Sequence, residues 1–101
     1  MLSDLKKEIS AIEEEVITLR RDFHQHPELG LKEIRTSRII ADYLEKTGLA
    51  VTTGVGQTGV IGLLQGAKPG KTLMMRADMD ALPIQEKNQE FFLNSSKNQF
   101  E

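Results

Sequence analysis

Apolar residues recur at alternating spacings of three and four along the first part of the chain, and charged residues fill most positions between them. The apolar positions are Leu2, Leu5, Ile9, Ile12, Val16, Leu19 and Phe23. This spacing predicts an amphipathic α-helix with one apolar stripe. Pro27 disfavours the helical conformation at His26, so we expect the helix to end near Gln25.

A second amphipathic pattern predicts a helix from about Lys32 to Lys46. Its apolar side would hold Ile34, Ile40, Ala41 and Leu44. Gly48 stands where a left-handed cap at the carboxyl end of a helix is favoured. Residues 27–30, with the sequence Pro-Glu-Leu-Gly, predict a turn between the two helices.

After Gly48 the chain becomes rich in β-branched residues and glycines, which predicts strands near Ala50–Thr53, Val60–Leu64 and Thr72–Ala77. The third is a nearly continuous apolar run, which is typical of a strand covered on both faces. A turn is expected at residues 67–70, Ala-Lys-Pro-Gly. The predicted fold class is therefore α/β, with two amino-terminal helices packed on a three-stranded, mostly buried sheet.

Composition limits the classes of function. The 101 residues are 39% apolar and 28% charged, which suits one small globular domain. Lys and Arg number 13 against 15 Asp and Glu, and neither sign forms a block of five or six, so a nucleic-acid partner is not expected. The chain contains no cysteine, which excludes disulfides and thiolate metal ligands from it.

The residues at each end of the sequence support further predictions. No apolar run of signal-peptide length follows Met1, so the sequence predicts a cytoplasmic protein with no membrane partner. From Lys87 the composition shifts to Asn, Gln, Ser and Lys. We therefore expect a domain over residues 1–86 and a polar tail over 87–101, whose Phe91 and Phe92 could dock on the domain.

The segment Gly54–Gly59 matches the dinucleotide-binding pattern Gly-x-Gly-x-x-Gly and follows a predicted strand. That pattern binds a pyrophosphate because its last glycine opens a helix. Here β-branched residues and three further glycines follow, which leaves no room for a helix. A glycine-rich turn of a β-hairpin is the favoured interpretation, and nucleotide binding stays an alternative.

Two pairs of residues are candidates for chemistry. His24 and His26 are two apart, and residues at that spacing on a helix point about 200° away from each other, so a shared metal would need an unwound helix end. Asp78 and Asp80 are two apart at the end of a predicted buried strand and would point to the same side. Such a pair suits a metal-bridging or ligand-orienting role, and the alternative is a loop-capping role with Asp78 paired to Arg76.

Two motifs together resemble a known family. They are His24-Gln25-His26-Pro27-Glu28-Leu29-Gly30, followed by Glu33 and Thr36, and Arg76-Ala77-Asp78-Met79-Asp80-Ala81-Leu82-Pro83-Ile84. In order and separation they resemble the amino-terminal part of the metal-dependent amidohydrolases that include hippurate hydrolase, N-acyl-amino-acid amidohydrolases and auxin-conjugate hydrolases, related to aminoacylase and zinc carboxypeptidases. The resemblance covers about residues 15–86.

The resemblance implies part of a larger, zinc-peptidase-like catalytic domain that carries two divalent metals, zinc or manganese, and hydrolyses the amide of an N-acyl amino acid or peptide. It also implies motif positions at His26, Pro27, Glu28, Gly30, Arg76, Asp78, Asp80 and Pro83. In the wider clan the Asp78 position is a histidine ligand, so direct metal ligation by Asp78 is doubtful. Asp80 is the better candidate, as the catalytic-site residue that orients a ligand.

The family's later segments, a His-x-Cys-Gly-His-Asp string and a Glu-Glu pair that includes the general base, have no counterpart in the chain. A truncation, a frame-shifted reading or a deliberate fragment would each produce this pattern. We therefore expect an amino-terminal fragment that does not retain the two metals and is inactive alone. Self-association through an exposed sheet edge is also expected. A non-catalytic module that pairs through its first helix, whose apolar stripe also suits a coiled coil, stays an alternative.

Overall fold

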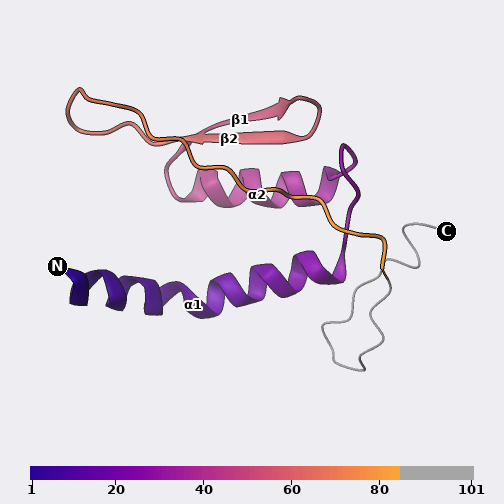
Figure 1. Ribbon diagram of the computed structural model, residues 1–101, viewed down its shortest axis with the longest axis horizontal. Helices are drawn as coiled ribbons and strands as arrows, with labels where there is room; N and C mark the ends of the chain where they lie inside the picture. Colours follow the sequence, from indigo (N-terminus) through magenta and orange to yellow (C-terminus); the bar gives the residue numbers. More distant parts are fainter. Residues whose placement is uncertain (85–101) are drawn as a thin grey trace. The chain divides into compact units, whose positions relative to one another are not determined.

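The structure, a computed structural model, describes residues 1–84, so the tail with Phe91 and Phe92 lies outside the described residues. Four elements follow one another along the chain: α1 (Leu2–Gln25), α2 (Ile34–Lys46), β1 (Ala50–Val55) and β2 (Gly59–Leu63) (Figure 1). The described residues divide into two compact units. One contains Met1–Pro27 with residues 83 and 84, and the other contains Glu28–Leu82.

The first unit consists mainly of α1, which ends at Gln25 as predicted. The chain leaves the helix at His26, whose N–H donates to the carbonyl oxygen of Phe23 at 3.3 Å. No residue of α1 is buried. Its apolar stripe is at least 46% exposed from Leu2 to Val16, so this stripe contributes no buried side chain to a core.

In the second unit, β1 and β2 form an antiparallel hairpin in which Ala50 faces Leu63 and Thr52 faces Ile61. The turn between the strands uses the left-handed region, with φ of 57° at Gly56 and 90° at Gln57. The interpretation of Gly54–Gly59 as a hairpin turn is therefore confirmed. The helix that nucleotide binding would require after Gly59 is replaced by β2.

The small core of the second unit lies where α2 packs on this hairpin. Ala41 of α2 is 6% exposed. A Cβ atom on Gly62 would lie 3.1 Å from Cδ1 of Leu44 and from Cδ1 of Leu49. The hairpin thus approaches α2 closely because position 62 carries no side chain.

The second helix begins two residues later than predicted and buries fewer residues. Leu31 adopts a φ of 65°, and the N–H of Lys32 bonds to the carbonyl oxygen of Leu29 at 2.9 Å. The turn between the helices therefore continues to Glu33, and α2 starts at Ile34. At this first helical position Ile34 is 67% exposed.

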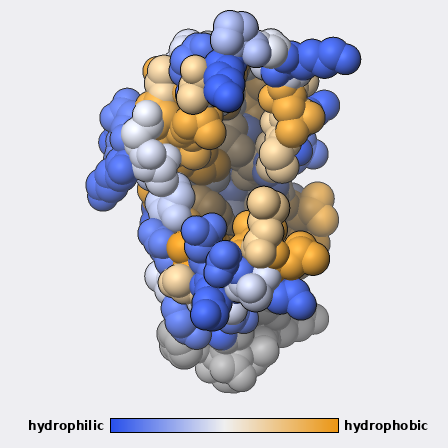
Figure 2. Space-filling model, turned by 90° about the vertical axis from the view of Figure 1, so that its left-hand side faces the viewer, coloured by the Kyte–Doolittle hydropathy of each residue, from blue (hydrophilic) through white to orange (hydrophobic). Residues whose placement is uncertain are grey.

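The predicted third strand, Thr72–Ala77, is also wrong for the described part of the chain, whose sheet has two strands. Residues 72–77 form neither helix nor strand. Leu73, Met74 and Met75 are 84%, 84% and 87% exposed rather than covered on both faces. A strand needs a neighbour for its N–H and C=O groups, and residues 1–84 supply none for this segment. Apolar side chains consequently lie open on the surface of the molecule (Figure 2).

Within residues 1–84, neither helix is long and apolar enough to cross a membrane.

Candidate functional site

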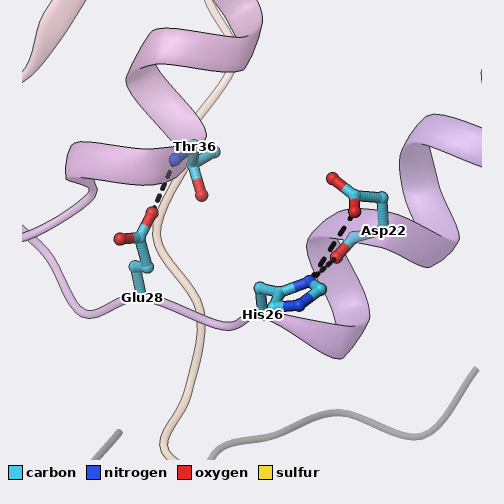
Figure 3. A network of polar contacts seen from close by, with 4 residues as sticks. All are labelled: Asp22, His26, Glu28 and Thr36. Carbon is cyan, nitrogen blue, oxygen red and sulfur yellow. Dashed lines mark hydrogen bonds and ion pairs between the residues drawn. The ribbon is translucent and has the colours of Figure 1, made fainter.

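Glu28 binds the amino-terminal end of α2 with its carboxylate (Figure 3). The N–H of Arg35 donates to Oε2 at 3.1 Å, and the N–H of Thr36 donates to Oε1 at 2.6 Å. These are the second and third residues of α2, whose N–H groups have no acceptor within the helix. A carboxylate is favoured at this end because the helix dipole is positive there.

This environment changes the acidity of Glu28. Burial raises the pKa of its carboxyl group, but hydrogen bonds from the Thr36 side chain and from the N–H groups of Thr36 and Arg35 lower it, as does the positive charge of Arg35. The lowering contributions win, so the pKa of Glu28 lies below its ordinary value. Glu28 is therefore a carboxylate at neutral pH.

The backbone of the same residue contacts the aspartate motif. The N–H of Ala81 donates to the carbonyl oxygen of Glu28 at 2.8 Å. A Cβ atom on Gly30 would lie 3.9 Å from Oδ2 of Asp80, which places the Asp80 carboxylate next to this turn. The structure thus brings Glu28 and Gly30 of the first motif together with Asp80 and Ala81 of the second, about 50 residues apart in sequence.

Asp78 has a different environment. Its Oδ1 lies 3.3 Å from a guanidinium nitrogen of Arg76, and the two side chains are 73% and 81% exposed. The Asp78–Arg76 pair expected in the loop-capping alternative is therefore present. The prediction that the aspartates follow a buried strand is wrong in the described residues, because residues 72–77 form no strand and are exposed.

A shallow depression of about 320 Å³ connects these groups within the second unit. Its polar lining comes from three segments: the turn before α2 contributes Glu33, the hairpin turn contributes Thr58, and the aspartate segment contributes Arg76, Asp78 and Asp80. The negative groups outnumber the positive one. The depression therefore suits a cationic or hydrogen-bond-donating ligand group better than an anion.

The histidines of the first motif lie at the end of α1 in the other unit. Nδ1 of His26 lies 3.0 Å from the carbonyl oxygen of Asp22 and 3.6 Å from its carboxylate Oδ1 (Figure 3). With the proton on Nδ1, His26 donates to the carbonyl oxygen one turn back. The His26 ring therefore has a hydrogen-bond acceptor within the last turn of α1.

The described residues do not fit the metal centre that the resemblance implies. Residues 1–84 contain no group of three or more His, Cys, Asp or Glu residues placed to hold a metal ion. A catalytic zinc needs about three protein ligands and a dinuclear centre needs more. Asp78 and Asp80 alone fall short of either.

The role of Glu28 at α2 was not apparent from the sequence. Sequence reasoning expects a capping side chain at the residue that immediately precedes a helix, or three residues inside it. Glu28 instead lies six residues before Ile34 and reaches α2 because the turn around Leu31 folds back. The signal that could have found it is the motif itself, in which Thr36 follows Glu28 by eight residues.

Comparison with known proteins gives several similar chains. The chain is 47% identical over 87 residues to thermostable carboxypeptidase 1 of Saccharolobus solfataricus, which covers 85% of this chain and 22% of that protein. It is 40% identical over 83 residues to hippurate hydrolase of Campylobacter jejuni, covering 82% of this chain and 22% of that protein. No protein-family model matches the chain.

The fold has a counterpart among solved structures. A Bacillus subtilis protein described as a dinuclear metal binding peptidase superimposes with a TM-score of 0.77 at 37% identity, over 85% of this chain and 24% of that one. These similarities define the chain as a homologue of amidohydrolases and carboxypeptidases that act on amide bonds. The solved structure belongs to the M20 family, and this chain is homologous to amidohydrolases of that family. The chain spans about a fifth of the length of the curated relatives that it matches.

Proposed function

We propose that the chain is part of the catalytic domain of a metal-dependent hydrolase that cleaves the amide bond of N-acyl amino acids or peptides. The observation that carries this proposal is the contact between the two family motifs, in which Glu28 and Gly30 lie against Asp80 and Ala81. Relatives named as a carboxypeptidase and a hippurate hydrolase support the substrate class.

In this proposal Asp80 is the residue that orients a ligand in the complete site. Its carboxylate lies beside Gly30, whereas Asp78 pairs with Arg76. The two divalent metals of the family, zinc or manganese, would polarise the amide carbonyl and activate water when bound. The described residues lack the ligands to hold them, so we expect the chain alone to be inactive.

A hybrid enzyme tests the proposal. In it, residues 1–84 of this chain replace the matched segment of the Saccharolobus carboxypeptidase, and hippurate and N-acetyl amino acids serve as substrates with added zinc or manganese. We expect turnover by the hybrid, a loss of at least about tenfold on Asp80→Asn, and no loss on Asp42→Asn, which changes an exposed aspartate of α2. The isolated chain should show no turnover above a metal-only blank. An inactive but folded hybrid would contradict the proposal, and so would turnover that Asp80→Asn leaves unchanged.

A second candidate function is pairing of two copies through α1. The observation that favours it is the exposed stripe of α1, from Leu2 at 73% to Val16 at 50% exposure, which repeats with the spacing of a coiled coil. Ile12→Asp places a charge in this stripe, and Glu14→Gln changes the adjacent polar face. If α1 is the pairing surface, light scattering should detect a dimer that Ile12→Asp abolishes and Glu14→Gln preserves.

A further inference from the structure

Glu28 forms hydrogen bonds with both its side chain and its backbone. Its carboxylate accepts the N–H groups of Arg35 and Thr36, and its carbonyl oxygen accepts the N–H of Ala81. We infer that Glu28 is a positioning residue: its side chain fixes its own backbone against α2, and that backbone then fixes the segment that carries Asp80.

The side chain restricts the backbone of Glu28 because it closes a ring. The chain runs from Glu28 through the turn to Thr36, eight residues later, and the carboxylate joins the two ends. Both carboxylate oxygens take part, which also fixes the plane of the carboxylate. The turn is closed a second time where the N–H of Lys32 bonds to the Leu29 carbonyl oxygen. The direction of the Glu28 carbonyl is thus determined by α2.

Ala81, which donates to the Glu28 carbonyl oxygen, lies in a segment that depends on contacts with other segments. Residues 64–82 of the second unit form no helix or strand, so no ladder of backbone hydrogen bonds holds them in place. The bond from Ala81 to Glu28 links this segment to the rest of the unit at 2.8 Å.

Asp80 directly precedes Ala81, so the peptide bond that carries the Ala81 N–H contains the carbonyl carbon of Asp80. Fixing this peptide group limits where the Asp80 side chain can lie. Its Oδ2 lies next to Gly30, two residues after Glu28. The assignment of Glu28 rests on this geometry, and only its purpose, the orientation of Asp80 in a hydrolase, rests on the proposed function.

Amide hydrogen exchange in the intact 101-residue chain tests the inference. Glu28→Ala removes the carboxylate but leaves the backbone carbonyl that Ala81 binds. We expect the Ala81 amide to exchange at least about tenfold faster in this variant. Glu28→Gln retains an acceptor oxygen and should restore part of the protection. Glu45→Ala, an exposed glutamate near the other end of α2, should leave Ala81 unchanged.

A second variant approaches the same connection from its other end. Ala81→Pro removes the N–H donor but leaves Glu28 unchanged. The Thr36 amide should therefore keep its protection from hydrogen exchange, while the NMR resonances of Asp80 shift. Amides of the β1–β2 hairpin report in each variant whether the second unit is folded.

The inference is overturned if Ala81 exchange in Glu28→Ala equals that of the unchanged chain, or if Glu28→Gln restores nothing. Faster exchange at Ala81 together with equal acceleration in the hairpin would also overturn it, because Glu28 would then act on the whole unit. An inactive hybrid enzyme would contradict the proposed function but would leave these exchange results standing.

Discussion

The β1–β2 hairpin and residues 72–77 have sequences of the same type and adopt different structures. Gly59–Leu63 is a short apolar run, and it pairs with Ala50–Val55 across a three-residue turn. Thr72–Ala77 is equally apolar, yet its Leu73, Met74 and Met75 are at least 84% exposed. The hairpin strands each find a partner within about ten residues, whereas the described residues contain no partner for 72–77. An apolar β-type run is thus not sufficient for a strand.

Disrupting the paired region should have the largest effect. A Cβ atom on Gly59 would collide with the carbonyl oxygen of Val55, so Gly59→Ala forces the hairpin turn to shift. We expect the free energy of unfolding to fall by about 1–3 kcal/mol, measured by urea denaturation. Gly70→Ala is the matched control because a Cβ there would meet nothing within 4 Å, and it should change stability by less than about 0.5 kcal/mol. Equal effects of the two substitutions would mean that the hairpin does not limit stability.

The unpaired region, residues 72–77, should cause copies of the chain to associate. Residues 72–77 present apolar side chains and a backbone without a neighbouring strand in the described part of the chain. Such a segment is a template for pairing with a second chain. We expect light scattering to detect dimers or larger species, and Met75→Lys to shift the population at least about threefold toward monomer.

Two controls test whether residues 72–77 are the surface through which the chain associates. Ile61→Lys adds the same charge to an exposed side chain of β2, which already has a partner, and should shift the population less. A version that ends at Glu86 shows whether residues 87–101 protect the segment. If this shorter chain is folded and strictly monomeric, the unpaired segment is not an association surface.

Local patterns predicted the fold where the interacting residues are near in sequence. The end of α1 follows from Pro27, and the hairpin follows from the glycines of Gly54–Gly59. The third strand failed because its existence depends on a partner elsewhere, which periodicity does not reveal. The predicted start of the second helix failed for a related reason: the turn at Leu31 continues to Glu33, so α2 begins at Ile34 rather than near Lys32.

The candidate site was predictable only in part. The motifs identified Glu28, Gly30 and Asp80, and the pairing of Asp78 with Arg76 followed from their two-residue separation. The contact between the motifs joins positions about 50 residues apart through a backbone N–H and a backbone carbonyl. Every residue other than proline has both groups, so no side-chain pattern encodes this contact.

The smallest expected effect concerns pH and sharpens the account of the paired region, because α2 supports the hairpin. The pKa of Glu28 results from burial, which raises it, and from the hydrogen bonds of Thr36 and Arg35 and the Arg35 charge, which lower it further than burial raises it. The folded pKa therefore lies below the unfolded value of about 4.3. The stabilisation of α2 by the Glu28 carboxylate is fully present above that unfolded value and is lost as the pH falls through the folded pKa.

At pH 7, Glu28→Gln should lower the free energy of unfolding by about 1 kcal/mol, the typical contribution of a helix cap. This difference should shrink as the pH falls below the unfolded value of about 4.3, whereas Glu45→Gln, at an exposed position, should show little difference at any pH. Urea denaturation at several pH values measures it, and a difference that stays constant with pH would mean that the charge of Glu28 does not stabilise α2.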